Sequence, residues 1–287
     1  MKRISIFLSC TLYFIYSNLT AQNLSHPIVD AHCHVKTIPA EEYSPFITME
    51  NYFVENKSFN IKYLFGLTIA HKDRIEETKA RNDSLFLMSR RDSRFIPVCS
   101  VHPDDGEAAI EELHRIKDLG GKIIKLHPLT QNFAISSRET FHVAQVAGEL
   151  GLVILTDGYG FIYQADYLEQ LLRLTLAFPK TKFIIAHIGG TDFHKLSGIK
   201  SVRGLNPGMF DNVWYDLSGT VSMYADSPYK SHLEWIIRSI GVDRVLFGTD
   251  NPVASLSETL NAFYKLDFNN SEREKILYKN AIELLGL

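Results

Sequence analysis

The chain has 287 residues, of which 45% are hydrophobic and 22% are charged, and its formal net charge is −3. This composition is that of a globular protein with a sizeable core, and the length suits one large α/β barrel or two ordinary domains. No basic stripe accompanies the weakly negative charge, which argues against nucleic acid as a partner. Since no linker or low-complexity segment divides the chain, a single domain is the simplest organisation.

The first 21 residues have the layout of a secretory signal peptide. Lys2 and Arg3 precede a mostly apolar run over residues 4–16, and a polar stretch follows with Ala21 near its end. This order predicts export with cleavage after Ala21, and therefore a periplasmic or secreted protein. The apolar run is too short for a comfortable membrane span, although an uncleaved anchor is the alternative.

Two cysteines, Cys33 and Cys99, remain in the predicted mature domain, residues 22–287. Two cysteines do not make the disulfide framework of a small secreted protein, so this domain must be stable through its core. We expect both cysteines to be free thiols.

Short β-branched or aromatic segments alternate with longer amphipathic segments over the rest of the chain. This alternation is typical of βα units and predicts a parallel sheet. The expected strands are residues 28–34, 63–71, 95–102, 122–127, 152–157, 182–187, 213–218 and 244–250. The expected helices are residues 73–91, 107–119, 138–150, 166–178, 231–240, 257–266 and 271–285. Ser271 followed by Glu274 predicts a capping box at the start of the last helix.

Eight strands alternating with helices in one domain predict a (β/α)8 TIM barrel. The alternative, an open doubly wound sheet, needs a glycine-rich phosphate loop after the first strand. This chain has Asp30-Ala31-His32-Cys33-His34 there instead. The glycine-rich segment between residues 187 and 213 predicts an extended loop over the barrel mouth, with or without a short helix.

The ends of the expected strands carry imidazole, amino and carboxyl groups. His32 and His34 point to the same side of the first strand, so their neutral imidazoles can share one metal ion. The other strand ends carry His71, His102, Lys125 with His127, Asp157, His187, Asp216 and Asp250. Because the active sites of TIM barrels lie at the carboxyl ends of the strands, this pattern predicts a site at that rim.

Several motifs resemble the amidohydrolase superfamily. They are Asp-x-His-x-His at residues 30–34, Ile-Ile-Ala-His-Ile-Gly-Gly at 184–190 and Val-Leu-Phe-Gly-Thr-Asp-Asn-Pro at 245–252. The closer match is the branch that contains aminocarboxymuconate-semialdehyde decarboxylase and related hydrolases and lactonases. Lys-Leu-His-Pro at 125–128 and Asn-Ala-Ile-Glu-Leu-Leu at 280–285 also resemble that branch. The resemblance covers essentially the whole mature chain and implies a metal-dependent barrel enzyme.

In that family, the two histidines of strand one and the aspartate of strand eight hold a divalent metal, usually zinc. The resemblance therefore implies His32, His34 and Asp250 as metal ligands, the layout of a catalytic zinc site with one position left for water. It also implies that Asp250 takes a proton from that water. His187 would act as the general acid or base, or would hold a developing oxyanion.

The chain departs from this family at the fifth strand. Relatives typically carry a histidine ligand there, in a segment that reads roughly His-Thr-Gly, whereas this chain has Thr156, Asp157 and Gly158. A threonine hydroxyl is a poor zinc ligand, and Asp157 could replace the histidine only if the strand twists or bulges. His127 is another replacement. The third alternative is a site with weak metal affinity, or one that works without metal.

Four further residues at the strand ends, Lys125, His127, His102 and His71, are expected to contact the substrate. For Lys125 the alternative is a structural ion pair, and for His102 and His71 it is support of neighbouring residues. Asp216 is expected to support a histidine or to contact the substrate.

These residues together predict an exported, metal-dependent hydrolase that cleaves an amide, ester or lactone bond of a small molecule, carboxylated or not. A non-oxidative decarboxylase is the alternative within enzymes, although export and Thr156 count against it. A barrel that binds a ligand without catalysis is the alternative from another class. We expect no stable membrane span, and the oligomeric state is left open.

Overall fold

The sheet of this protein has eight parallel strands in the order β1-β2-β3-β4-β5-β6-β7-β8. The computed structural model describes residues 26–38, 45–160 and 164–287. The predicted signal peptide, residues 1–21, lies outside this part of the chain and stays a prediction. The strands are β1 (Ile28–His34), β2 (Ile61–Leu67), β3 (Phe95–Ser100), β4 (Ile123–Leu126), β5 (Val153–Thr156), β6 (Phe183–Ile185), β7 (Val213–Asp216) and β8 (Val245–Leu246).

The segment after β8 closes the sheet against β1. The amide of Ala31 donates to the carbonyl of Phe247 at 2.9 Å, and the amide of Asp250 donates to the carbonyl of His32 at 2.7 Å. The predicted TIM barrel is therefore confirmed. The same two hydrogen bonds bring Asp250, the last residue of the predicted site, beside the first histidine of that site.

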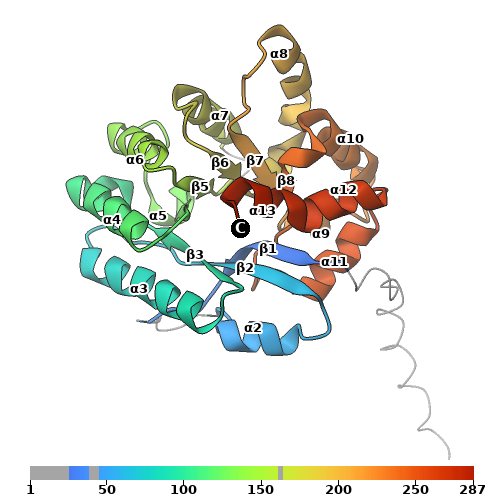
Figure 1. Cartoon of the computed structure of the whole chain (residues 1–287). Coiled ribbons are helices and arrows are strands. Elements are labelled where there is room, and N and C mark those ends of the chain that lie inside the picture. Colours follow the sequence, from blue (N-terminus) through green and yellow to red (C-terminus); the bar gives the residue numbers. More distant parts are fainter. Residues whose placement is uncertain (1–25, 39–44, 161–163) are drawn as a thin grey trace, which may run out of the picture.

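Helices surround the strands (Figure 1). They are α2 (Met49–Glu55), α3 (Ile75–Arg91), α4 (Glu107–Asp118), α5 (Pro128–Gln131), α6 (Arg138–Glu149), α7 (Tyr167–Ala177), α8 (Ile199–Leu205), α9 (Thr220–Tyr224), α10 (Lys230–Ile240), α11 (Leu256–Tyr264), α12 (Asn270–Glu274) and α13 (Asn280–Leu285). The described part of the chain also contains three 3-10 segments, η1 (Pro103–Asp105), η2 (Ala186–Gly198) and η3 (Val242–Arg244), and a π-helical turn, η4 (Lys275–Lys279). None of the described helices is both long and apolar enough to cross a membrane.

The core has two parts, one on each side of the strands. Side chains such as Val29, Leu155 and Ile184 fill the barrel interior, and Leu284 of α13 packs against them. In Figure 1, α13 crosses the centre of the ring of strands and so covers one end of the barrel. A larger cluster, to which Cys33 belongs, packs between the strands and the helices. Because α13 covers one end, the mouth at the opposite end is left for a site.

Several predicted boundaries are corrected by the structure. Strands β2 and β8 end at Leu67 and Leu246, earlier than predicted, because the chain leaves the sheet ladder before it reaches the polar residues of the mouth. The capping box near the C-terminus is formed by Asn269 and Glu272, not by Ser271 and Glu274.

Some segments contain helices that the sequence analysis did not predict, and one predicted helix is interrupted. The glycine-rich segment after β6 folds as η2 and the short helix α8, which the sequence analysis allowed within a loop, and α2 is a helix that the sequence pattern did not predict. The predicted helix over 271–285 is interrupted by η4. The two cysteines are buried free thiols, as expected.

Candidate functional site

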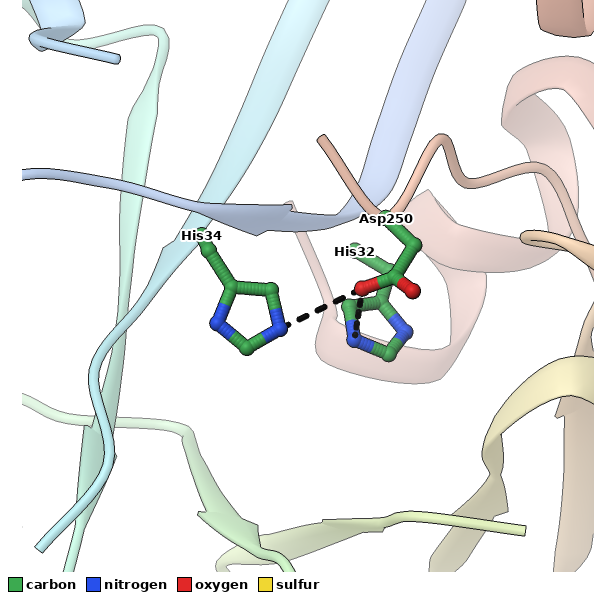
Figure 2. A group of neighbouring side chains, drawn as sticks. All are labelled: His32, His34 and Asp250. Carbon is green, nitrogen blue, oxygen red and sulfur yellow. Dashed lines mark ion pairs between the residues drawn. The ribbon is translucent and has the colours of Figure 1, made fainter. Parts of the chain in front are cut away.

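The end of β1 directs two imidazole rings to the barrel mouth. One extra residue interrupts the pairing of β1 with β2, since Asp30 aligns with Leu64 and Cys33 with Gly66. Asp30 accepts a hydrogen bond from Tyr52 of α2 at 2.7 Å, whereas His32 and His34 lie on the same side of β1, as predicted (Figure 2).

Asp250 lies between the two rings of β1. Its Oδ1 is 3.4 Å from Nε2 of His32 and 3.2 Å from Nε2 of His34 (Figure 2). One ligand atom from each of the three residues lies within 4.8 Å of the others. Two imidazole nitrogens and a carboxylate oxygen that face one point are a donor set suited to a divalent transition metal.

The hydrogen bonds of His32 test this fit. Nδ1 of His32 is 3.0 Å from Oδ2 of Asp216, so Nδ1 carries the proton and Nε2 keeps a lone pair toward Asp250. Burial, with the positive charge of Lys125, lowers the pKa of His32 to about 4, although Asp216 and Asp250 oppose this shift. A metal ligand must be a neutral imidazole, and the residues present therefore fit a metal ion.

The backbone turns sharply where the chain delivers two of the site residues. His187 and Asp250 both have φ of 58°, in the left-handed region that residues other than glycine rarely adopt. Gly248 allows the segment after β8 to pass close to β1, because a Cβ atom there would lie 2.9 Å from Cβ of His32. This close passage seats Asp250 at the mouth.

Asp216, at the end of β7, links the two histidines of the mouth. Besides its bond to His32, it accepts hydrogen bonds from the backbone amides of His187 at 3.1 Å and Ser218 at 3.0 Å. The hydroxyl of Ser218 also donates to it. These four donors agree with the lowered pKa of Asp216, whose burial would by itself raise that pKa while the His32 and His187 rings lower it. The predicted support of a histidine is what Asp216 provides.

His187 forms an ion pair with Asp157. Nδ1 of His187 lies 2.9 Å from the carbonyl of Ser218, and Nε2 lies 3.0 Å from Oδ1 of Asp157. Because both partners are acceptors, both ring nitrogens carry protons and the ring is an imidazolium. Burial would lower the pKa of His187, but the hydrogen bond and charge of Asp157 outweigh it and raise the pKa to about 9.

The departure at the fifth strand is resolved by this ion pair. Asp157, just past β5, reaches the mouth, but its carboxylate pairs with His187 and lies 3.8 Å from Nδ1 of His127. Among the described histidines and carboxylates, neither Asp157 nor His127 belongs to a group close enough to share a metal with His34 and Asp250. The other close group, His32 with His187 and Asp216, is the hydrogen-bonded network described above.

The four predicted substrate contacts have different surroundings. Lys125 is 1% exposed, and its Nζ lies 3.2 Å from Nε2 of His32. His102 is buried, with Nε2 2.7 Å from the carbonyl of Gln131 and Nδ1 accepting from the amide of Asp104. Both ring nitrogens of His102 are therefore engaged, which favours the alternative held open for it, support of neighbouring residues, over a substrate contact.

The cavity at the mouth has a volume of about 570 Å³. The residues that line it are His127, Leu129, Thr130, Asp157, Tyr159, His187, Gly219, Thr220, Met223, Asp250 and Val253. His127 thus lies where the prediction put it, whereas Lys125, His102 and His71 do not line the cavity. Leu129, Met223 and Val253 are the apolar wall of this cavity, and its other lining residues include the ionisable groups of His127, Asp157, His187 and Asp250.

Several residues of the site escaped the sequence analysis. Ser218 is the last residue of the predicted strand 213–218 and joins the Asp216 network, and Met223 and Val253 come from segments after β7 and β8. Gln131 ties the ends of three strands together, since its amide donates to the carbonyls of Ala70 and Val101 and accepts from His127. The only available signal was their place shortly after a strand end.

Comparisons with known proteins agree with this barrel. Residues 29–287 match the sequence profile of the family described as Amidohydrolase. No curated protein gives a significant match.

Solved structures of similar fold include several decarboxylases. The 5-carboxyvanillate decarboxylase of Sphingomonas paucimobilis has a TM-score of 0.72 at 14% identity, covering 92% of this chain and 100% of the other. That of Novosphingobium aromaticivorans, complexed with manganese and 4-hydroxy-3-methoxy-5-nitrobenzoic acid, has a TM-score of 0.71 at 16% identity, covering 93% and 98%. A 2,6-dihydroxybenzoate decarboxylase from Rhizobium has 0.67 at 16%, covering 91% and 98%. At such identities the likeness establishes the fold, and together with the family match over almost all of the described barrel it shows that this chain belongs to the amidohydrolase family.

Proposed function

We propose that this protein is a metal-dependent decarboxylase that acts on a small carboxylated ring compound. The observation that carries the proposal is a cavity lined by Asp250, which belongs to the set of His32, His34 and Asp250, by the His187–Asp157 pair and by apolar side chains. The fold shared with benzoate-type decarboxylases supports it. This proposal replaces hydrolysis, our first prediction, as the preferred reaction.

A divalent metal would be held by His32, His34 and Asp250. When bound, such an ion acts as a Lewis acid on a carboxylate or hydroxyl oxygen of the substrate. Zinc is the metal that the sequence predicts, and manganese is bound in similar solved structures. Imidazole and carboxylate ligands suit both ions, so both are to be tested.

His187 is the group best placed to supply a proton. Its imidazolium lines the cavity and is kept charged at neutral pH by Asp157. In the proposed reaction, a proton passes from Nε2 of His187 to the ring carbon that bears the carboxylate. The carbon–carbon bond then breaks, its electron pair stays with the ring, and carbon dioxide leaves. The carbonyl of Ser218, which accepts from Nδ1, holds the neutral imidazole in place until Nε2 regains a proton from water and pairs with Asp157 again.

The apolar wall suits the ring of such a substrate. Leu129, Met223 and Val253 line the same cavity as the carboxylates of Asp157 and Asp250, and Tyr159 stands edge-on to His187 with ring centroids 6.4 Å apart. A planar ring packed against these side chains would lie in the same cavity as His187 and Asp250. Pockets with an apolar lining and a few placed polar groups are the common form of small-molecule sites.

Hydrolysis of an amide, ester or lactone remains the second candidate because of Asp250. Burial would raise the pKa of Asp250, but the neighbouring His32 and His34 rings hold it well below its usual range. A carboxylate that stays ionised beside a metal-ligand set suits a base that accepts a proton from an attacking water.

The test uses purified protein loaded with Mn²⁺ or Zn²⁺ and a panel of hydroxybenzoates labelled with ¹³C at the carboxylate. We expect ¹³CO₂ release from one of them, abolished by a chelator and reduced at least about 100-fold by His187→Asn. Hydrolysis of a parallel lactone and ester panel without ¹³CO₂ release would establish the second candidate instead. An active protein that contains no metal would refute both.

A further inference from the structure

Lys125 occupies an unusual position for a lysine. It lies in β4, it is almost completely buried, and its Nζ is 3.2 Å from Nε2 of His32. Lys122, just before the same strand, has instead an amino group that donates to the carbonyls of Leu285 and Gly286 near the C-terminus. Lys125 is therefore directed to the mouth, while Lys122 serves the opposite end of the barrel.

The hydrogen bonds of His32 leave one lone pair for two partners. Nδ1 of His32 donates to Asp216, so Nε2 is the only acceptor of the ring and receives the hydrogen bond from Lys125. The same Nε2 belongs to the ligand set with His34 and Asp250. One lone pair cannot accept a hydrogen bond from an ammonium group and bind a metal ion at the same time.

The charges around Lys125 are those that a metal ion would also meet. Burial lowers the pKa of Lys125, and the attraction of Asp157, Asp250 and Asp216 for its ammonium group opposes this shift. Buried carboxylates are costly without a neighbouring cation, and Lys125 supplies one in the protein without metal. A divalent ion at the ligand set would stand beside this ammonium group, and the two cations repel each other.

We propose that Lys125 is a built-in competitor of the metal ion. In the metal-free protein it holds Nε2 of His32 and offsets the charge of the three carboxylates, and it gives up this contact when a metal binds. The inference rests on the proposed function only in that both place the metal on the same ligands. It makes Lys125 a determinant of metal affinity instead of a contact for the substrate.

The experiment compares Lys125→Met with Lys122→Met, which removes the same charge before the same strand but far from the mouth. Each full-length protein is stripped with a chelator and titrated with Mn²⁺ and with Zn²⁺ in a calorimeter. We expect Lys125→Met to bind metal about 10- to 100-fold more tightly than the wild type, as loss of a competing hydrogen bond to a charged group implies. Lys122→Met should bind as the wild type does.

A second variant and a second measurement are needed in case Lys125→Met is unstable without metal. Lys125→Gln keeps a donor without the charge, and the rise in melting temperature on adding Mn²⁺ should be larger for it than for the wild type. Unchanged or weaker binding by both Lys125 variants would overturn the inference and leave the proposed function standing. Metal binding by the variants but not by the wild type would support the inference and refute metal dependence of the native enzyme. No binding by any of the proteins would refute both.

Discussion

Replacement of Asp216 by asparagine tests how the fold prepares His32 for metal. The carboxylate at the end of β7 accepts the Nδ1 proton of His32 and three further hydrogen bonds from His187 and Ser218. An asparagine keeps one oxygen for those three donors, so its NH₂ group faces Nδ1. That ring nitrogen must then become the acceptor, and the proton moves to Nε2, the atom of the ligand set.

The expected magnitude follows from these four contacts. The charged hydrogen bond to His32 is worth about 1.5–3 kcal/mol, and the other three weaken with the loss of charge, so we expect a destabilisation of about 2–4 kcal/mol. Loss of the partner that orients a metal ligand typically costs about 10- to 100-fold in metal affinity. The loss of stability and the loss of metal affinity come from the same substitution, but they are measured separately.

The assay combines urea unfolding of the metal-free protein with calorimetric titration of Mn²⁺ and Zn²⁺. Asp211→Asn is the matched control, because Asp211 precedes the same strand and is 58% exposed, and we expect no change in either measurement. If Asp216→Asn binds metal as tightly as the wild type, Asp216 does not set the proton position of His32, and the fit argued for the metal fails.

Three further predictions concern the fold and the chain ends. Gly248→Ala should lower the free energy of unfolding in urea by about 1–3 kcal/mol, because the new Cβ would lie 2.9 Å from Cβ of His32 in β1. Gly204→Ala, whose Cβ would have nothing within 4 Å, should not destabilise the protein. Equal losses of stability in the two variants would contradict this prediction. Burial raises the pKa of Cys33 and Cys99, so a thiol reagent at pH 8 should label both only after unfolding, and rapid labelling of the folded protein would count against the structure. Mass spectrometry of protein exported from bacterial cells should give a chain that starts after Ala21, and an intact N-terminus would disprove the predicted cleavage.

The barrel could be predicted from the sequence because its signal is repeated. Each strand is a short apolar segment, and polar residues with imidazole, amino or carboxyl groups follow at the next turn. Strands two and eight were predicted to extend to His71 and Asp250, which is too far. Residues of the mouth continue the sequence pattern of a strand, but their backbones do not take part in the hydrogen-bonded ladder of the sheet. Backbone hydrogen bonding decides the end of a strand, and composition does not report it.

The site could be predicted only in part. The family resemblance joined Asp250 to His32 across 218 residues of sequence, and the structure brings them within 3.4 Å. The partner of Asp157 could not be predicted, because the direction of a side chain one residue past a strand depends on the local turn. The contact of Lys125 with His32 was also missed, since a lysine that reaches across a barrel depends on the curvature of the whole sheet.

Two residues, Lys125 in β4 and Asp157 just past β5, act in the same direction on a metal ion. Relatives typically carry a histidine ligand at the fifth strand, where this chain has Asp157, whose carboxylate keeps His187 protonated instead of joining the ligand set. Lys125 then competes for the lone pair of His32. The chain thus gains a charged acid at the mouth and loses hold of the metal, so we expect an ion that exchanges readily. Dialysis against metal-free buffer should remove most of it within hours, and stoichiometric metal retained through dialysis would show that three ligands suffice to hold it tightly.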